Sequence, residues 1–74
     1  MSVEVVKYLS VGLVMLSTIG AAYAVGKIGA AGLDGMARNP EASGSLLTAM
    51  ILAIAFAEAL AIYALVVAFL ILFA

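Results

Sequence analysis

The chain has 74 residues, of which 69% are hydrophobic and 9% are charged, with a net charge of −1 and neither cysteine nor histidine. Soluble domains are only about 45–50% apolar, and a chain this short needs a polar exterior, a metal or disulfides to fold alone in water. The composition therefore argues against a water-soluble fold, and it offers neither a metal-ligand set nor a basic stripe for nucleic acid.

The first predicted element is a transmembrane helix over residues 4–37. Between Tyr8 and Leu33 the only charge is Lys27. This run exceeds the ~20 residues that cross a hydrocarbon core of about 30 Å. It therefore predicts one complete membrane span.

The start of the chain also has features of a secretory signal. Lys7 would be its basic region and Val11–Ile19 its apolar core, followed by an A-x-A cleavage sequence at residues 22–24. Glu4 does not suit a basic region, and the apolar run continues past the cleavage sequence. We therefore favour a retained helix.

Small residues alternate along this helix, at positions Gly20, Ala22, Ala24 and Gly26. Helices in lipid associate through close van der Waals contact, which small side chains permit. Alternate positions cover more than one face, so we expect close neighbours on two sides. The alternative is that membrane helices are commonly rich in Gly and Ala.

The second predicted element is a polar turn over residues 38–43. Pro40 suits a first helical position, and Asn39 can cap a helix. Glu41 suits the positive end of a helix dipole. Basic residues near the turn, Lys27 and Arg38, weakly favour a cytoplasmic turn.

The third predicted element is a second transmembrane helix over residues 44–74, whose only charge is Glu58. Alanines recur along it and predict a helix that packs on one side and faces lipid on the other. These alanines are Ala49, Ala53, Ala57, Ala61, Ala64 and Ala68. The economical structure is an all-α antiparallel hairpin, one domain over residues 1–74, because backbone amides in lipid must pair internally.

Glu58 is predicted to lie near the bilayer midplane, ~20–24 Å from each helix end. Charged side chains at this depth usually mark ion pathways or proton relays. We expect a neutral carboxyl facing lipid, and an ionised one where water or a positive partner is available. One alternative is a permanent ion pair with Lys27, although we expect Lys27 to extend towards the loop instead. Tyr63 can either bond to the acid or simply pack in the bundle.

Taken together, these motifs resemble the c-subunit, the proteolipid of F-type ATP synthases. The resemblance covers nearly the whole chain. It is carried by the alternating small residues, by the loop sequence at 35–42, by Phe56-Ala57-Glu58-Ala59, and by Tyr63 with residues 67–73.

The resemblance implies a cylindrical homo-oligomeric ring, with helix 4–37 inside and helix 44–74 outside, packed through the alternating small residues. It implies that Glu58 is reversibly protonated and that its neutral form bonds to the carbonyl of Phe56, with Tyr63 nearby. The a-subunit of the stator would supply two half-channels and an arginine that meets the ionised acid. Rotation would couple proton flow to ATP synthesis, with no covalent chemistry in this chain and no cofactor.

The resemblance also implies that the loop residues Arg38, Asn39 and Pro40 touch the central stalk subunits gamma and epsilon. Membrane lipids would surround the ring. The expected location is the bacterial inner (plasma) membrane, with both termini opposite a cytoplasmic loop. The absence of a transit peptide before Tyr8 favours a bacterial or organelle-encoded protein.

Departures from the family pattern bear on the ion and on ring size. Sodium-binding relatives carry Gln at the position of Val25 and Ser at the position of Ala59, so the resemblance implies a proton as the transported ion. Alanine at positions 22 and 24 partly replaces the family's glycines, which predicts an effect on ring size. Lys27 is not part of the pattern.

Two alternatives to this function stay open at the level of sequence. A holin-like or structural membrane hairpin would use the small residues for oligomerisation and Glu58 only as a polar helix contact. A proteolipid of a related rotary pump would work in the hydrolytic direction.

Overall fold

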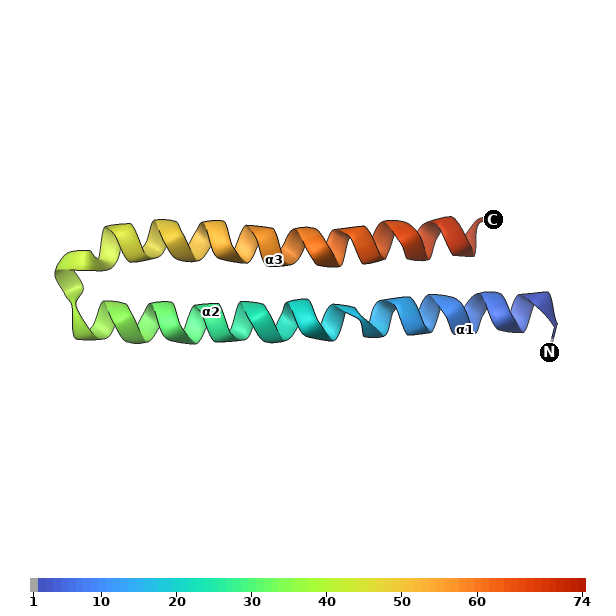
Figure 1. Cartoon of the computed structure of the whole chain (residues 1–74), viewed down its shortest axis with the longest axis horizontal. Helices are drawn as coiled ribbons and strands as arrows, with labels where there is room; N and C mark the ends of the chain where they lie inside the picture. Colours follow the sequence, from blue (N-terminus) through green and yellow to red (C-terminus); the bar gives the residue numbers. More distant parts are fainter. Residues whose placement is uncertain (1) are drawn as a thin grey trace.

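A computed structural model describes residues 2–74 as two long antiparallel helical arms joined by a tight turn (Figure 1). The first arm consists of α1 (Val3–Leu16) and α2 (Thr18–Arg38), and the second arm is α3 (Ser43–Leu72). A short 3-10 turn, η1 (Pro40–Ala42), precedes α3. The Cα atoms span 59 × 16 × 8 Å. The predicted all-α hairpin is confirmed.

The arms begin or end at residues 3, 38, 43 and 72, where the sequence predicted 4, 37, 44 and 74. The first arm is also interrupted at Ser17, between α1 and α2. There the Ser17 hydroxyl donates to the Val14 carbonyl, and the Thr18 hydroxyl donates to the Met15 carbonyl at 2.7 Å. Hydroxyls that bond back to the preceding turn often bend helices, which accounts for the local irregularity.

The turn reverses the chain within a few residues. The amide of Asn39 donates to the Gly35 carbonyl at 2.9 Å and closes α2. Pro40 then occupies the first position of η1, where its missing amide proton leaves no bond unmade. Asn39 takes the N-cap position of η1, as predicted, and its carbonyl accepts from the Ala42 amide at 3.0 Å, but its side chain makes no capping bond. Within the same turn the Ser43 hydroxyl donates to the Pro40 carbonyl at 2.6 Å.

α3 packs along both α1 and α2 through a line of mostly small side chains. Its buried and half-buried positions along this line recur every three or four residues: Leu46, Met50, Ala53, Ala57, Ala61, Ala64, Ala68 and Ile71. This spacing is that of helices packed at a shallow angle, as in coiled coils. The predicted alanine face is confirmed from Ala53 onward and wrong at Ala49, which is exposed.

The register between the arms is fixed at both ends of the hairpin. Lys7 lies opposite Ala74, since its Nζ donates to the Ala74 carbonyl at 2.9 Å. Near the turn, Gly32 lies against the Met50 side chain. The residue numbers in these pairs add to 81 and 82, so a residue n of the first arm lies level with about residue 81 − n of α3. Glu58 is therefore level with Tyr23.

The hairpin has almost no core of its own. Within residues 2–74 the buried side chains are Ala21, Ala57 and Ala68. Large apolar side chains such as Leu13, Leu60 and Phe73 are 65–78% exposed. Both arms are long and apolar enough to cross a membrane. Lipid and neighbouring helices must therefore cover most of this surface.

Candidate ion-binding site

Glu58 lies at the middle of α3, 15 residues after Ser43 and 14 before Leu72. At 1.5 Å per residue it is about 22 Å from one end of the helix and about 21 Å from the other. Its side chain is exposed, and no hydrogen bond or ion pair holds it within residues 2–74. The carboxyl is therefore available to groups outside the hairpin.

The surroundings of Glu58 allow only limited chemistry. The neighbouring large side chains on α3 are apolar, and an ionised carboxylate at mid-membrane costs at least ~2.5–3.5 kcal/mol. A neutral carboxyl avoids most of this cost. The ionised form needs water or a positive charge supplied by another molecule, so the site can take up and release a proton only where such a partner lies beside it.

Lys27 is not that partner within the chain. Among residues 2–74 the ion pair within 4.0 Å is Arg38–Asp34, at 3.2 Å. The Nζ of Lys27 lies 5.8 Å from the centroid of the Tyr23 ring. The prediction that Lys27 extends towards the loop is therefore wrong, since Tyr23 lies one turn farther from the loop. Helical side chains tilt towards the N-terminus, which explains this direction.

The other predicted residues of the proton site lie on α3 but on a different side. Tyr63 follows Glu58 by five residues, which places it about 140° around the helix. Phe56 is seven residues before Tyr63 and shares its side. The side chain of Phe56 is 75% exposed and that of Tyr63 is 69% exposed. The hairpin therefore does not bring Tyr63 to its own Glu58, and the exposed Tyr63 side chain is open to groups outside the hairpin.

The alternating small residues lie on the two flanks of α2. Positions four apart share a face, so Gly20 and Ala24 lie on one flank, and Ala22 and Gly26 lie on the opposite one. A Cβ added at Gly20 or Gly26 would meet nothing within 4 Å. The hairpin itself does not use this space, which leaves both flanks open to close approach by other helices.

Two glycines lie against α3 inside the hairpin: a Cβ at Gly35 would lie 3.3 Å from the Cδ1 of Leu46, and Gly32 has a still closer neighbour. A Cβ at Gly32 would overlap the Sδ of Met50 and lie 2.8 Å from its Cγ. The sequence pattern alone does not distinguish Gly32 from the other glycines. The signal that identifies it is the antiparallel register, which places a long side chain of α3 opposite this position.

The loop residues lie at the far end of the hairpin from Glu58. The Arg38 side chain is 79% exposed and its partner Asp34 is 62% exposed. Asn39 and Pro40 are exposed at the tip of the turn. A contact made by these residues is therefore separated from Glu58 by about 22 Å of helix.

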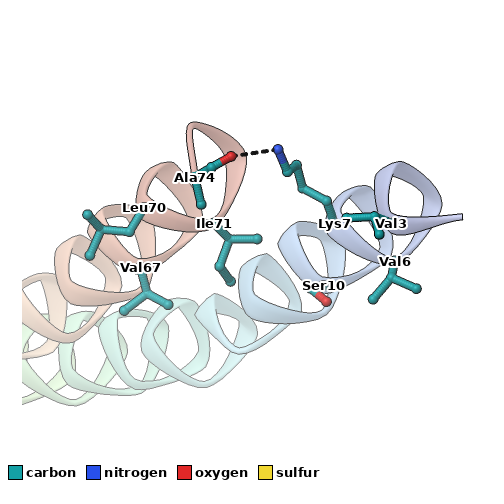
Figure 2. A pocket seen from close by; sticks show the side chains of 8 residues that line it. All are labelled: Val3, Val6, Lys7, Ser10, Val67, Leu70, Ile71 and Ala74. Atoms are coloured by element: carbon teal, nitrogen blue, oxygen red, sulfur yellow. Dashed lines mark hydrogen bonds between the residues drawn. The ribbon is translucent and has the colours of Figure 1, made fainter.

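An apolar groove lies at the opposite end of the hairpin, between the first turns of α1 and the last turns of α3. Figure 2 shows Lys7 reaching across this groove to Ala74, above the side chains of α1 and α3 that line it. The lining residues are Val3, Val6, Lys7, Ser10, Val67, Leu70, Ile71 and Ala74. Glu58 is not among them, so the groove and the acid are separate features.

The chain is similar to a large group of known proteins. Residues 9–71 match the family of ATP synthase C-subunits. The ATP synthase c-subunit of Dehalococcoides mccartyi is 47% identical over 74 residues, covering 99% of this chain and 97% of the relative. The ATP synthase c-subunit of Thermotoga petrophila is 49% identical over 67 residues, covering 89% and 79%. The mitochondrial ATP synthase subunit 9 of Yarrowia lipolytica is 40% identical over 68 residues, covering 92% and 90%.

Proposed function

The chain belongs to the ATP synthase C-subunit family, and we propose that Glu58 is the group that carries the transported ion around the rotor ring. As a member of this family the chain is a membrane component of the ATP synthase complex and not a catalytic one. It serves in the rotor ring. The holin-like alternative is not favoured, because relatives that match nearly the whole chain are ATP synthase subunits.

The ion at Glu58 is a proton. A sodium ion needs several hard oxygen ligands. Val25 and Ala59 offer no side-chain oxygen, and the exposed side chains of Phe56 and Leu60 are apolar. A proton needs only the carboxyl and a hydrogen-bond acceptor such as the Phe56 carbonyl. No cofactor takes part.

The observation that carries this proposal is the position of Glu58, exposed at mid-depth on the flank of α3 and without a partner in residues 2–74. While neutral, the carboxyl can rotate through lipid at little cost. Beside the stator it ionises next to an arginine of the a-subunit, which supplies two half-channels. One charge moved through the membrane potential corresponds to ~2.3 kcal/mol per 100 mV, which drives rotation.

The arrangement of the ring follows from the flanks of the first arm. With α1 and α2 inside and α3 outside, the flank formed by Gly20 and Ala24 meets the flank formed by Ala22 and Gly26 of the next copy. Small residues on both flanks suit the crowded inner circle. The same contact places Tyr63 of one copy on the side of α3 that approaches the next copy's acid.

The two ends of the hairpin have different roles. Arg38, Asn39 and Pro40 contact the central stalk subunits gamma and epsilon from the exposed turn. The turn lies in the cytoplasm of a bacterium and both termini lie across the plasma membrane. Basic residues near the turn support this orientation. The bacterial source of two of the relatives supports the plasma membrane as the location.

Substitution of the acid tests the proposal. In the complete ATP synthase, Glu58→Gln should abolish ATP-driven proton pumping while the ring still assembles, because the amide is similar in shape but cannot release a proton. Glu41→Gln is the matched control: Glu41 is exposed in the turn and its loss should leave pumping unchanged. Pumping that survives in Glu58→Gln would refute the role of this carboxyl.

A hydrophobic carbodiimide tests the identity of the ion. This reagent attacks protonated carboxyls in lipid, so it should modify Glu58 selectively and faster at low pH. Sodium should have no effect on the rate. Protection by sodium would refute the proton assignment, and an unmodified Glu58 would contradict a neutral acid in the membrane.

A further inference from the structure

The first arm carries a stripe of large apolar side chains on the face turned away from α3, on both sides of Gly12. They lie three, four or seven residues apart and are 45–67% exposed: Val5, Leu9, Leu16, Ile19 and Tyr23. Tyr23 is two positions from both Ala21 and Val25, which pack towards α3, and so lies about 200° away from each. From Val5 to Tyr23 the stripe is about 27 Å long, close to the ~30 Å of a hydrocarbon core.

A single positive charge ends this stripe on the side of the turn. Lys27 is exposed one turn after Tyr23, and its Nζ lies 5.8 Å from the centre of the tyrosine ring. The next acid along this arm is Asp34, about 10 Å farther along the helix and paired with Arg38 at 3.2 Å. Glu58 lies on the flank of the other arm. Within residues 2–74, therefore, no acid balances Lys27.

We propose that Lys27 binds the phosphate of an anionic phospholipid whose acyl chains lie on the stripe from Val5 to Tyr23. Tyrosine and lysine are the side chains that mark the boundary between hydrocarbon and headgroups. Here they follow an apolar face about as long as a hydrocarbon core, and because Tyr23 is level with Glu58, the boundary that they mark inside the ring is displaced from the one around α3. Given the proposed position of the first arm inside the ring, this lipid occupies the centre of the ring.

A second copy of the chain does not suit this face. Close helix contact in lipid relies on small side chains, and the hairpin places them on the two flanks of α2. The stripe instead presents Leu16, Ile19 and Tyr23, each more than half exposed. Bulky apolar side chains that end at a cation fit an amphiphile with an acidic headgroup.

The proposal also sets the depth of this lipid. On α3 the apolar sequence continues to Leu46, which is level with about residue 35 of the first arm. Lys27 is eight residues from that level, or about 12 Å along the axis. The headgroups at Lys27 therefore lie about 12 Å farther from the turn than those that border α3.

The test measures which lipids stay with the assembled ring. Rings are reconstituted in phosphatidylcholine vesicles with a minor fraction of phosphatidylglycerol, extracted in mild detergent, and analysed for both lipids by mass spectrometry. Wild-type rings should be enriched in phosphatidylglycerol relative to the vesicles. Lys27→Gln should lower the enrichment about fivefold, and Lys27→Arg should retain it. Lys7→Gln, at the other end of the arm, is the matched control and should leave it unchanged.

Three results would overturn the proposal. The first is equal enrichment in wild-type and Lys27→Gln rings. The second is an equal loss in Lys7→Gln, which would indicate a general effect of charge. The third is enrichment in the wild-type ring that does not fall as salt is raised, a measurement that needs no variant. Glu58→Gln rings should keep the lipid, so this proposal and the proton-carrier role succeed or fail separately.

Discussion

Gly32→Ala tests how closely the two arms pack near the turn. The added Cβ would overlap the Sδ of Met50 and lie 2.8 Å from its Cγ. The position of Cγ depends on χ1, and a helical methionine has only two favourable χ1 values. Rotation of the terminal methyl therefore does not relieve the overlap. Either Met50 changes its χ1 or the arms separate slightly.

Two opposing contributions determine the magnitude. Overpacking typically costs about 1–3 kcal/mol, while Gly→Ala inside a helix stabilises by up to about 1 kcal/mol. Gly32→Ala should therefore destabilise the hairpin by roughly 0–3 kcal/mol. In a Met50→Ala background the overlap is absent, and the same exchange should stabilise by up to about 1 kcal/mol. The expected result is a reversal of sign, with a coupling energy of about 1–3 kcal/mol.

Opening of the hairpin can be followed by energy transfer between dyes on cysteines introduced at Val3 and Phe73. Both residues are exposed, at 80% and 78%, and the chain has no cysteine of its own. Labelled chains are assembled with an excess of unlabelled chains and titrated with SDS. Gly12→Ala is the matched control, since its Cβ would meet nothing within 4 Å and should not couple to Met50. If Gly32→Ala is equally destabilising with and without Met50, the overlap is not its cause.

Two further predictions concern polar groups. Asp34→Asn breaks the ion pair with Arg38, but both side chains are more than half exposed, so we expect a change of less than about 0.5 kcal/mol in ring stability on thermal unfolding. A change several times larger would mean that Asp34 has a second partner in the assembly. Tyr63→Phe should speed carbodiimide modification of Glu58 in the ring and not change it in separated hairpins, because Tyr63 lies about 140° from its own acid. An equal rate of modification in wild-type and Tyr63→Phe rings would mean that Tyr63 only packs against its neighbours.

The architecture of the hairpin is predictable from the positions of its charges. Two apolar runs, each with one interior charge, and a polar turn between them leave few other structures possible in lipid. The alanine face of α3 is also predictable, since the repeat of three and four residues is a property of the sequence. The exception is Ala49, which the repeat includes but which lies beside the contact line, because Leu46, Met50 and Ala53 occupy it there.

Other features depend on the packed geometry and escape prediction. The direction of Lys27 depends on the tilt of helical side chains towards the N-terminus, which brings its Nζ to Tyr23 and not to the loop. The absence of a capping bond from the Asn39 side chain accompanies the 3-10 geometry that Pro40 begins, which the sequence pattern does not reveal. The importance of Gly32 depends on which residue of α3 lies opposite, and hence on the register.

The separation between the contact line and the acid explains why the hairpin is incomplete alone. Ala57 lies at the centre of that line and is 8% exposed, whereas Glu58, one residue later, is about 100° around the helix. A carboxyl on the contact line would need a permanent hydrogen-bond partner between the two arms. It would then be closed off from any outside group that could take or give a proton. On the flank, its partners are necessarily outside the chain; under the proposed function they are the next copy while the acid is neutral and the stator while it is ionised. Because of this one-residue offset, Ala57 stabilises the hairpin, while Glu58 is free for the ion exchange with other subunits that we propose.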